Sequence, residues 1–252
     1  MGYDKELALA HRWADEADAI ALEHFRTGAL TEIKPDGTPV TAGDRAVERA
    51  LRRNIERDFP RDAILGEEEG ETGSAARRWV IDPIDGTKNY ARGVPVFATL
   101  LALQQAGEPV LGLVSAPALG SRWWATKGER AFASGSPIHV STIDTLERAD
   151  VVTGGDDWAL ADPEAYAALL RRVHRHRAFG DFWGHMLVAQ GSAEIMLEHA
   201  PLAPWDIAAP ALIVTEAGGR CTTFDGEAAR GGPTLSTNGL LHDEVLATVG
   251  GR

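Results

Sequence analysis

Cysteine and long hydrophobic runs are the features that this sequence lacks. Cys221 is the only cysteine among 252 residues, which excludes a disulfide within the chain and is typical of a protein from a reducing compartment. No apolar run approaches the roughly 18–20 residues of a membrane span. Residues 1–10 are too polar and charged to form the apolar core of a signal peptide. We therefore expect a cytoplasmic protein.

Basic residues are few relative to acidic ones. The 25 lysines and arginines stand against 37 aspartates and glutamates, which gives a net charge of −12. A surface with this charge repels nucleic acid and anionic membranes, so we expect neither as a partner. The charge does not exclude a small phosphate-bearing substrate, because bound metal ions can reverse the local field.

Repeats, low-complexity tracts and flexible linkers are also absent from the sequence. A hydrophobic content of 44% is enough for a substantial core, and the length is compatible with one large domain or two small ones. No linker signal is seen near residues 140–150. We therefore expect a single domain over residues 1–252 with two lobes, approximately 1–145 and 146–252.

Hydrophobic periodicity predicts two helices near the start of the chain. The first has an apolar stripe at alternating three- and four-residue steps, made of Leu7, Ala10, Ala14, Ala17, Ala21 and Phe25. Gly28 is expected to end this helix, and residues 34–39 have the composition of a turn. A four-residue apolar repeat then predicts a second helix over residues 44–58.

After Pro60 the pattern changes to short apolar runs between Gly/Pro turns, which is typical of strands. An antiparallel hairpin is expected around residues 107–109. We predict strands at 63–65, 79–81, 97–103, 110–115, 122–125, 177–179, 195–197 and 220–224, and further helices at 163–173, 182–190 and 206–217. Helices that alternate with mixed strands indicate a layered α/β protein.

Four acidic residues stand where a predicted strand ends or a predicted helix begins: Glu67, Asp82, Asp85 and Asp206. Strand ends converge at one edge of an α/β sheet, where ligands usually bind. Carboxylates gathered at such an edge repel one another unless cations neutralise them. Their hard oxygen ligands favour Mg²⁺, Mn²⁺ or Ca²⁺ over zinc.

The segment from Asp82 to Thr87 reads Asp-Pro-Ile-Asp-Gly-Thr. Two carboxylates three positions apart in a turn can hold two ions about 3.5–4 Å apart, as in two-metal phosphoryl chemistry. Gly86 lets a phosphate approach the backbone, and a helix beginning there would offer free N–H groups to an anion. Thr87 can orient a water molecule, with Asp44 as a plausible partner. Taken alone, an acidic glycine-containing loop is more often a solvated turn.

In combination, the motifs resemble those of the inositol monophosphatase superfamily. The resemblance rests on residues 79–90 (WVIDPIDGTKNY), 205–211 (WDIAAPA) and 39–44 (PVTAGD), and it covers essentially the whole chain. It implies a layered α-β-α-β-α sandwich of the inositol monophosphatase/fructose-1,6-bisphosphatase type, usually a homodimer. It also implies a hydrolase that acts on a small-molecule phosphate monoester with two or three Mg²⁺ ions, for which Mn²⁺ can substitute.

The resemblance also implies roles for individual residues. The positions that match the family's metal ligands are Glu67, Asp82, the Ile84 carbonyl, Asp85 and Asp206. The positions expected to bind phosphate or substrate are Asp85, Gly86, Thr87 and Asp206. The family mechanism is in-line attack by a water molecule activated near Glu67 and Thr87, with Asp44 bonded to the threonine. No phosphoenzyme is formed.

Further motifs are similar to the bacterial histidinol-phosphatase branch of this family: residues 115–119 with 122–124, 179–182 and 237–242. In inositol-specific members a small neutral residue follows the glycine that matches Gly180, whereas this chain has Asp181. Glu198 matches a substrate-binding position. Histidinol phosphate has an ammonium and an imidazole, which extra carboxylates suit better than they suit neutral inositol. Arg177 could meet the phosphate or hold Asp181. Asp181 could also cap a helix, instead of recognising the substrate or in addition to it.

Other functions stay open on the sequence alone. Inositol-1-monophosphatase, or a related sugar or nucleotide phosphatase, is the alternative within the family. A metal-dependent sugar-phosphate-binding regulator would keep the fold without catalysis. A haloacid-dehalogenase-like phosphatase is disfavoured because one residue separates its two aspartates, whereas two residues separate Asp82 and Asp85. His185, on a predicted apolar helix, is expected to be a hydrogen-bonded core histidine rather than a metal ligand.

Overall fold

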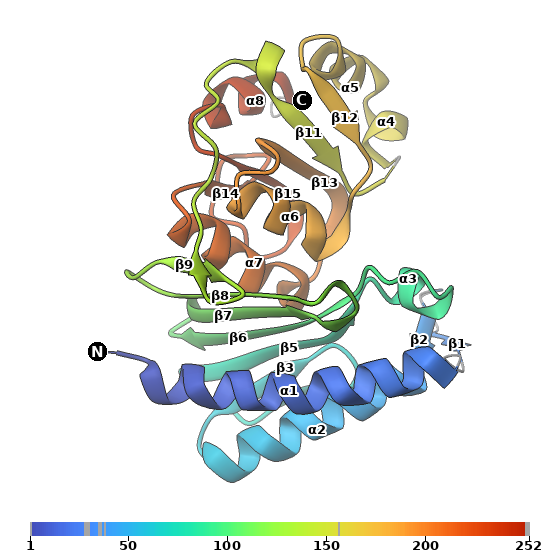
Figure 1. The fold of residues 1–252 in the computed structure, drawn as a ribbon, viewed down its shortest axis with the longest axis vertical. Coiled ribbons are helices and arrows are strands. Elements are labelled where there is room, and N and C mark those ends of the chain that lie inside the picture. The colour runs from blue at the N-terminus through green and yellow to red at the C-terminus, as the bar shows by residue number, and fades with distance from the viewer. Residues whose placement is uncertain (1, 28–30, 35–36, 38, 156, 250–252) are drawn as a thin grey trace.

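The computed structural model describes residues 2–27, 31–34, 37, 39–155 and 157–249. Helices α1 (Asp4–Thr27) and α2 (Ala42–Asp58) cover one face of an eight-stranded sheet (Figure 1). The expected helix stop at Gly28 and residues 35, 36 and 38 of the expected turn lie outside the described residues.

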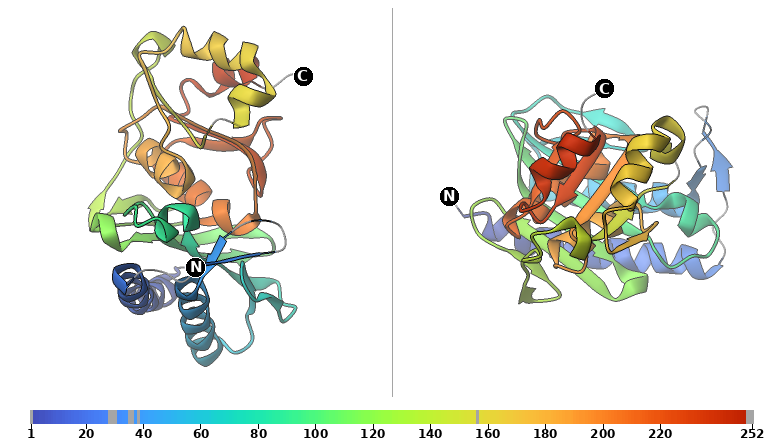
Figure 2. Two further views of the ribbon diagram at one scale, coloured as in Figure 1. Left: turned by 90° about the vertical axis from the view of Figure 1, so that its right-hand side faces the viewer. Right: turned by 90° about the horizontal axis from the view of Figure 1, so that it is seen from above.

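Three further layers complete the stack. The other face of the large sheet packs against α6 (Asp181–Ala189) and α7 (Pro204–Glu216), and a five-stranded sheet lies beyond these helices. The outermost layer consists of α4 (Asp157–Ala161), α5 (Pro163–Leu170) and α8 (His242–Val249). The side view in Figure 2 shows the same order of layers. The predicted α-β-α-β-α sandwich is confirmed.

The large sheet has the strand order β10-β9-β8-β7-β6-β5-β3-β4, and within it only β3 and β5 pair in parallel. Its strands are β3 (Ala63–Gly66), β4 (Gly70–Thr72), β5 (Arg77–Asp85), β6 (Ala98–Gln105), β7 (Glu108–Ala116), β8 (Ser121–Thr126), β9 (Ala131–Ala133) and β10 (Ser136–Pro137). The expected antiparallel hairpin joins β6 to β7. Strand β5 is longer than predicted and continues to Asp85, with a shift of register between Asp82 and Asp85.

The small sheet has the order β12-β11-β13-β15-β14. Its strands are β11 (Asp150–Thr153), β12 (Arg175–Arg177), β13 (Ile195–Leu202), β14 (Arg220–Thr223) and β15 (Gly232–Thr237). The strand predicted at 177–179 is wrong by two residues, because β12 pairs residues 175–177 with residues 150–152 of β11. The helix predicted at 163–173 ends at Leu170.

Two short elements complete the surroundings of the strand ends. Strands β1 (Thr31–Ile33) and β2 (Pro39–Thr41) form a separate antiparallel pair, and the short helix α3 (Thr87–Ala91) follows β5. Helix α2 begins two residues earlier than predicted, because Thr41 caps it and forms a capping box with Asp44. This cap fixes the buried Asp44 in the first turn of the helix, next to the end of β5.

The apolar stripe predicted for α1 lies in the core. Ala10, Ala14, Ala17 and Ala21 are at most 1% exposed, so α1 can approach its neighbours closely. Trp13 of this helix meets Trp79 of β5 edge to face, with ring centroids 5.0 Å apart. Although α1 has 24 residues, no helix in the described part of the chain has the length and apolar character of a membrane span.

The packing of β7 against α7 predicts the effect of one substitution. A Cβ atom on Gly112 would lie 2.9 Å from the carbonyl oxygen of Ala209. Gly112→Ala is therefore expected to lower the free energy of unfolding by about 1–3 kcal/mol, measured by chemical denaturation. The exposed Leu240→Ala control should change it by less than about 0.5 kcal/mol. A Gly112→Ala variant as stable as the wild type would contradict this packing.

Candidate active site

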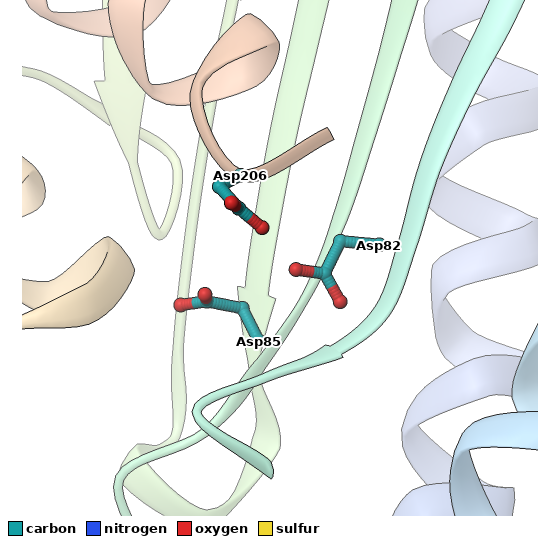
Figure 3. A group of neighbouring side chains, drawn as sticks. All are labelled: Asp82, Asp85 and Asp206. Atoms are coloured by element: carbon teal, nitrogen blue, oxygen red, sulfur yellow. The ribbon is translucent and has the colours of Figure 1, made fainter. Parts of the chain in front are cut away.

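Three aspartates meet where β5 ends and α7 begins. Asp82 and Asp85 come from β5 and Asp206 from the first turn of α7, and one carboxylate oxygen of each lies within 4.8 Å of the others. Figure 3 shows the three side chains around a common space. Asp82 and Asp85 are at most 9% exposed, and Asp206 is half-buried.

Backbone groups from different elements hold these carboxylates. The sequence indicated a turn between Asp82 and Asp85, but the structure has an irregular strand there, and the Pro83 carbonyl accepts a hydrogen bond from Thr99 at 2.8 Å. Asp85 Oδ2 accepts from the Phe182 N–H at 2.7 Å, and Asp206 Oδ2 accepts from the Ala203 N–H at 2.6 Å.

Burial and mutual repulsion shape the electrostatics of this cluster. Burial, followed by the charges of Glu67 and Asp85, raises the pKa of Asp82 well above its ordinary value. Burial and then the charge of Asp181 do the same to the pKa of Asp85. Burial is also the largest cause for Asp206, whose pKa is raised to about 6. The cluster is therefore costly to ionise without a cation.

The three-aspartate cluster fits a hard divalent cation. All its donors are carboxylate oxygens, the atoms that Mg²⁺ and Mn²⁺ prefer. Asp82 Oδ1 is buried and has no hydrogen-bond partner, which is costly for a polar atom unless a ligand engages it. The chemistry of the donor set thus agrees with a metal centre.

Glu67 lies beside the three aspartates, in the loop after β3. Its Oε1 atom lies 2.9 Å from the Lys34 ammonium, which also contacts Glu68 at 2.6 Å. Sequence reasoning missed Lys34, because a lysine in a turn-rich segment carries no signal that links it to an acid 33 positions later.

Thr87 and Asp44 lie together, as the sequence suggested. The Thr87 hydroxyl is 3.3 Å from Asp44 Oδ1 and 2.9 Å from the Ile84 carbonyl oxygen. Asp44 is fully buried, accepts the Thr41 N–H at 2.8 Å, and has a pKa raised mainly by burial. The threonine hydroxyl therefore has two acceptors within reach on the protein side.

A cavity of about 420 Å³ opens onto the cluster. Of the residues expected in the site from the sequence, it is lined by Glu67, Asp85, Gly86, Thr87, Asp181, Glu198 and Asp206. Asp82, Ile84 and Asp44 are not part of the lining and lie buried behind it. Most of the expected residues, from both halves of the chain, therefore share one cavity.

Asp181 faces this cavity from the start of α6. Its backbone is left-handed, with a φ of 55°, which is uncommon for a residue other than glycine. Its Oδ2 atom accepts a hydrogen bond from Asn89 Nδ2 at 3.3 Å. The alternative that Asp181 caps the helix is wrong, because Gly180 is the N-cap residue and the Phe182 N–H is bonded to Asp85.

Arg177 does not lie with the other predicted site residues. It is exposed on the edge strand β12, donates to the His176 carbonyl and lines a different hollow. The structure therefore does not bring Arg177 together with Asp181 or the aspartates, and its contact with phosphate stays a prediction. Strand β12 ends at Arg177, and three more residues separate it from the start of α6.

Other residues of the cavity wall were given no role from the sequence. Lys88, Asn89 and Phe182 lie in the motifs at residues 79–90 and 179–182 and line the cavity, and Gly154 lines it without belonging to any of the motifs. His185 is buried and its Nδ1 atom lies 2.8 Å from Ser236 Oγ, as expected of a hydrogen-bonded core histidine. It also lines the cavity, which periodicity along a helix cannot reveal.

Comparison with known proteins agrees with this geometry. Residues 3–250 match the model of the inositol monophosphatase family. The chain is similar to histidinol-phosphatase from Streptomyces coelicolor, with 48% identity over 259 residues (97% of this chain and 96% of the relative). Histidinol-phosphatase from Mycobacterium tuberculosis is also 48% identical, over 258 residues (98% of each). The solved IMPase from Thermotoga maritima has a TM-score of 0.89 at 33% identity, over 97% of this chain and 96% of that one.

The raised pKa values predict how metal binding depends on pH. A carboxyl whose pKa is raised by folding stabilises the fold while it is protonated, and this contribution is lost as the pH rises through about 6 for Asp206. The melting temperature of the metal-free protein should therefore fall between about pH 5 and about pH 7.5. Saturating Mg²⁺ should raise it by several degrees more at the higher pH, measured by scanning fluorimetry against EDTA. An equal Mg²⁺ effect at both pH values would contradict metal binding by these carboxylates.

Proposed function

The chain belongs to the inositol monophosphatase family, and we propose that within this family of phosphoric monoester hydrolases it is a Mg²⁺-dependent histidinol-phosphatase. The reaction is the hydrolysis of L-histidinol phosphate to L-histidinol and phosphate, in histidine biosynthesis. One observation carries the proposal: the cavity beside the aspartates has two further carboxylates, Asp181 and Glu198. The 48% identity to two histidinol-phosphatases supports it.

The two further carboxylates suit a substrate with a cationic end. Burial raises the pKa of Asp181, so a cation placed beside it would stabilise its charged form. Glu198 is only 5% exposed, although it lines the cavity. An ammonium or a protonated imidazole can form charge-assisted hydrogen bonds with both groups, whereas a neutral polyol offers no charge to them.

The metal would be held by Glu67, Asp82, the Ile84 carbonyl, Asp85 and Asp206, as the family resemblance implies. When bound there, Mg²⁺ would lower the pKa of water and neutralise negative charge on the phosphate oxygens. Gly86 has a φ of 79°, and a Cβ atom on it would lie 2.9 Å from the Val96 carbonyl oxygen. The absence of a side chain also leaves the backbone accessible to a phosphate group.

Thr87 and Glu67 are proposed to orient the attacking water molecule. When the Thr87 hydroxyl donates to buried Asp44, its oxygen lone pairs can accept a hydrogen bond from water. The Glu67 carboxylate can accept a second hydrogen bond from the same water molecule. The water oxygen would then attack phosphorus in line as the bond from phosphorus to the ester oxygen breaks. The Glu67 carboxylate would take up a proton from the water, the leaving oxygen would receive a proton from solvent, and no phosphoenzyme would form.

Hydrolysis of inositol 1-phosphate is the alternative within the family, and the similarity to the Thermotoga maritima IMPase favours it. The hydroxyl groups of inositol could donate hydrogen bonds to Asp181 and Glu198, but they offer no positive charge to either carboxylate. A sugar-phosphate-binding regulator is disfavoured because the acidic ligands, Thr87 and Asp44 all have the arrangement that catalysis needs. The family resemblance leads us to propose a homodimer, and the composition leads us to propose a cytoplasmic location.

Removal of one metal-ligating charge tests the enzymatic proposal. Asp85→Asn should lower Mg²⁺-dependent phosphate release by at least about 100-fold, because the neutral amide binds the cation poorly. The matched control is Glu69→Gln, which changes an exposed acid two residues after Glu67 and should leave the rate nearly unchanged. Release of phosphate by the Asn variant at the wild-type rate would exclude Asp85 from the metal site.

A second substitution tests the substrate. Asp181→Ser should depress kcat/KM for L-histidinol phosphate about tenfold or more, while the value for inositol 1-phosphate should change little, because only the first substrate has a cation for this carboxylate. Steady-state kinetics on both substrates measure the two losses. Equal losses on both substrates would mean that Asp181 does not determine the choice between them.

A further inference from the structure

Gly154 provides the space in which the Glu198 carboxylate lies. The glycine follows β11, and its N–H donates to the Leu197 carbonyl at 3.0 Å. A Cβ atom on Gly154 would lie 1.7 Å from Glu198 Oε2 and 2.1 Å from Cδ, far inside van der Waals contact. The carboxylate therefore lies directly against the α-carbon of Gly154, and both residues line the cavity.

The backbone of Gly180 packs closely against the backbone of Gly154. A Cβ atom on Gly180 would lie 2.6 Å from the Gly154 α-carbon and 2.9 Å from its carbonyl oxygen. The loops that follow β11 and β12 thus touch backbone to backbone. The next residue, Asp181, has a left-handed backbone conformation, and it faces the same cavity. One backbone contact therefore borders both carboxylates of the proposed substrate pocket.

Conformation does not explain these two glycines. Neither is among the glycines with positive φ, and Gly180 has a φ of −79°, which any residue can adopt. A methyl group on Gly154 would overlap with the Glu198 carboxylate. A methyl group on Gly180 would overlap with the backbone of Gly154. The close approach itself is the reason for glycine at both positions.

We propose that Gly154 is a positioning residue for substrate specificity: through the Gly154–Gly180 contact it sets where the Glu198 carboxylate stands relative to Asp181 and to the cationic end of the substrate. This inference rests on the proposed function. Charge-assisted hydrogen bonds need donor and acceptor within a few tenths of an ångström of their best separation, so a displaced carboxylate loses them. The three atoms nearest to a Cβ atom on Gly154 all belong to Glu198, so we expect the substitution to displace this carboxylate first and to leave the chemistry of the metal site in place.

Gly154→Ala tests this role by the ratio of two activities. The variant should lose at least about tenfold in kcat/KM for L-histidinol phosphate relative to inositol 1-phosphate, mainly through KM. The Mg²⁺ concentration for half-maximal activity should not change. The matched control is Gly219→Ala, whose Cβ atom would lie 2.5 Å from the Thr237 carbonyl oxygen, away from the cavity lining. This control should lower both activities equally, and an unchanged ratio in Gly154→Ala would overturn the proposal.

A double-mutant cycle with Glu198→Asp tests whether Gly154 acts through the carboxylate. The shorter acid withdraws from the glycine, so adding Gly154→Ala to Glu198→Asp should change the activity ratio by less than about twofold. If Gly154→Ala alone does not fold, the double variant should still fold and carry the comparison with Glu198→Asp. If the effects of the two substitutions on the activity ratio simply add, Gly154 has a packing role only. The same conclusion follows if the double variant also fails to fold.

Measurements on the wild-type protein distinguish a failure of the proposed function from a failure of the proposed role of Gly154. The wild-type preference for L-histidinol phosphate over inositol 1-phosphate reports on the proposed function before any variant is made. The change of that preference in Gly154→Ala reports on the contact. A wild type without the preference contradicts the function, whereas a preference that survives Gly154→Ala contradicts only the role of the glycine.

Discussion

Repulsion between three largely buried carboxylates is the constraint on which this structure depends. Asp82, Asp85 and Asp206 have oxygen atoms within 4.8 Å of one another, where burial and neighbouring charge raise their pKa values. Groups of like charge stay together where protons or a bound cation reduce their charge and the surrounding fold holds them in place. Here the irregular end of β5 and the N–H groups of Phe182 and Ala203 hold them. The bond from Asp85 to Phe182 also ties the large sheet to α6.

The two halves of the chain supply different residues of the candidate site. The first half gives Glu67, Thr87 and Asp44, which lie around the end of β5 and are suited to handle water and phosphate. The second half gives Asp181 and Glu198, which border the Gly154–Gly180 contact and are suited to recognise the rest of the substrate. Asp206 comes from the second half but completes the metal cluster. The proposed hydrolysis and the proposed specificity are therefore assigned to different residues of one site.

Periodicity and strand ends predicted most helices and the acidic cluster, because they are properties of neighbouring residues, whereas the order of the layers was implied by the family resemblance. Local patterns failed where an outcome depends on distant pairing. Arg177 was assigned to the site because β12 was placed two residues too late, and its true register is set by β11. The contact of Lys34 with Glu67 and the space that Gly154 leaves for Glu198 depend on loops brought together by the fold. No spacing in the sequence encodes them.

We propose that a metal-dependent acidic cavity of this protein hydrolyses a phosphate monoester with a cationic end. This proposal is tested by measuring kcat/KM of the wild-type protein for L-histidinol phosphate and for inositol 1-phosphate, each with Mg²⁺ and with EDTA. We expect activity only with Mg²⁺ and a preference of at least about tenfold for L-histidinol phosphate. Activity that persists in EDTA, or an equal or greater activity on inositol 1-phosphate, would contradict it.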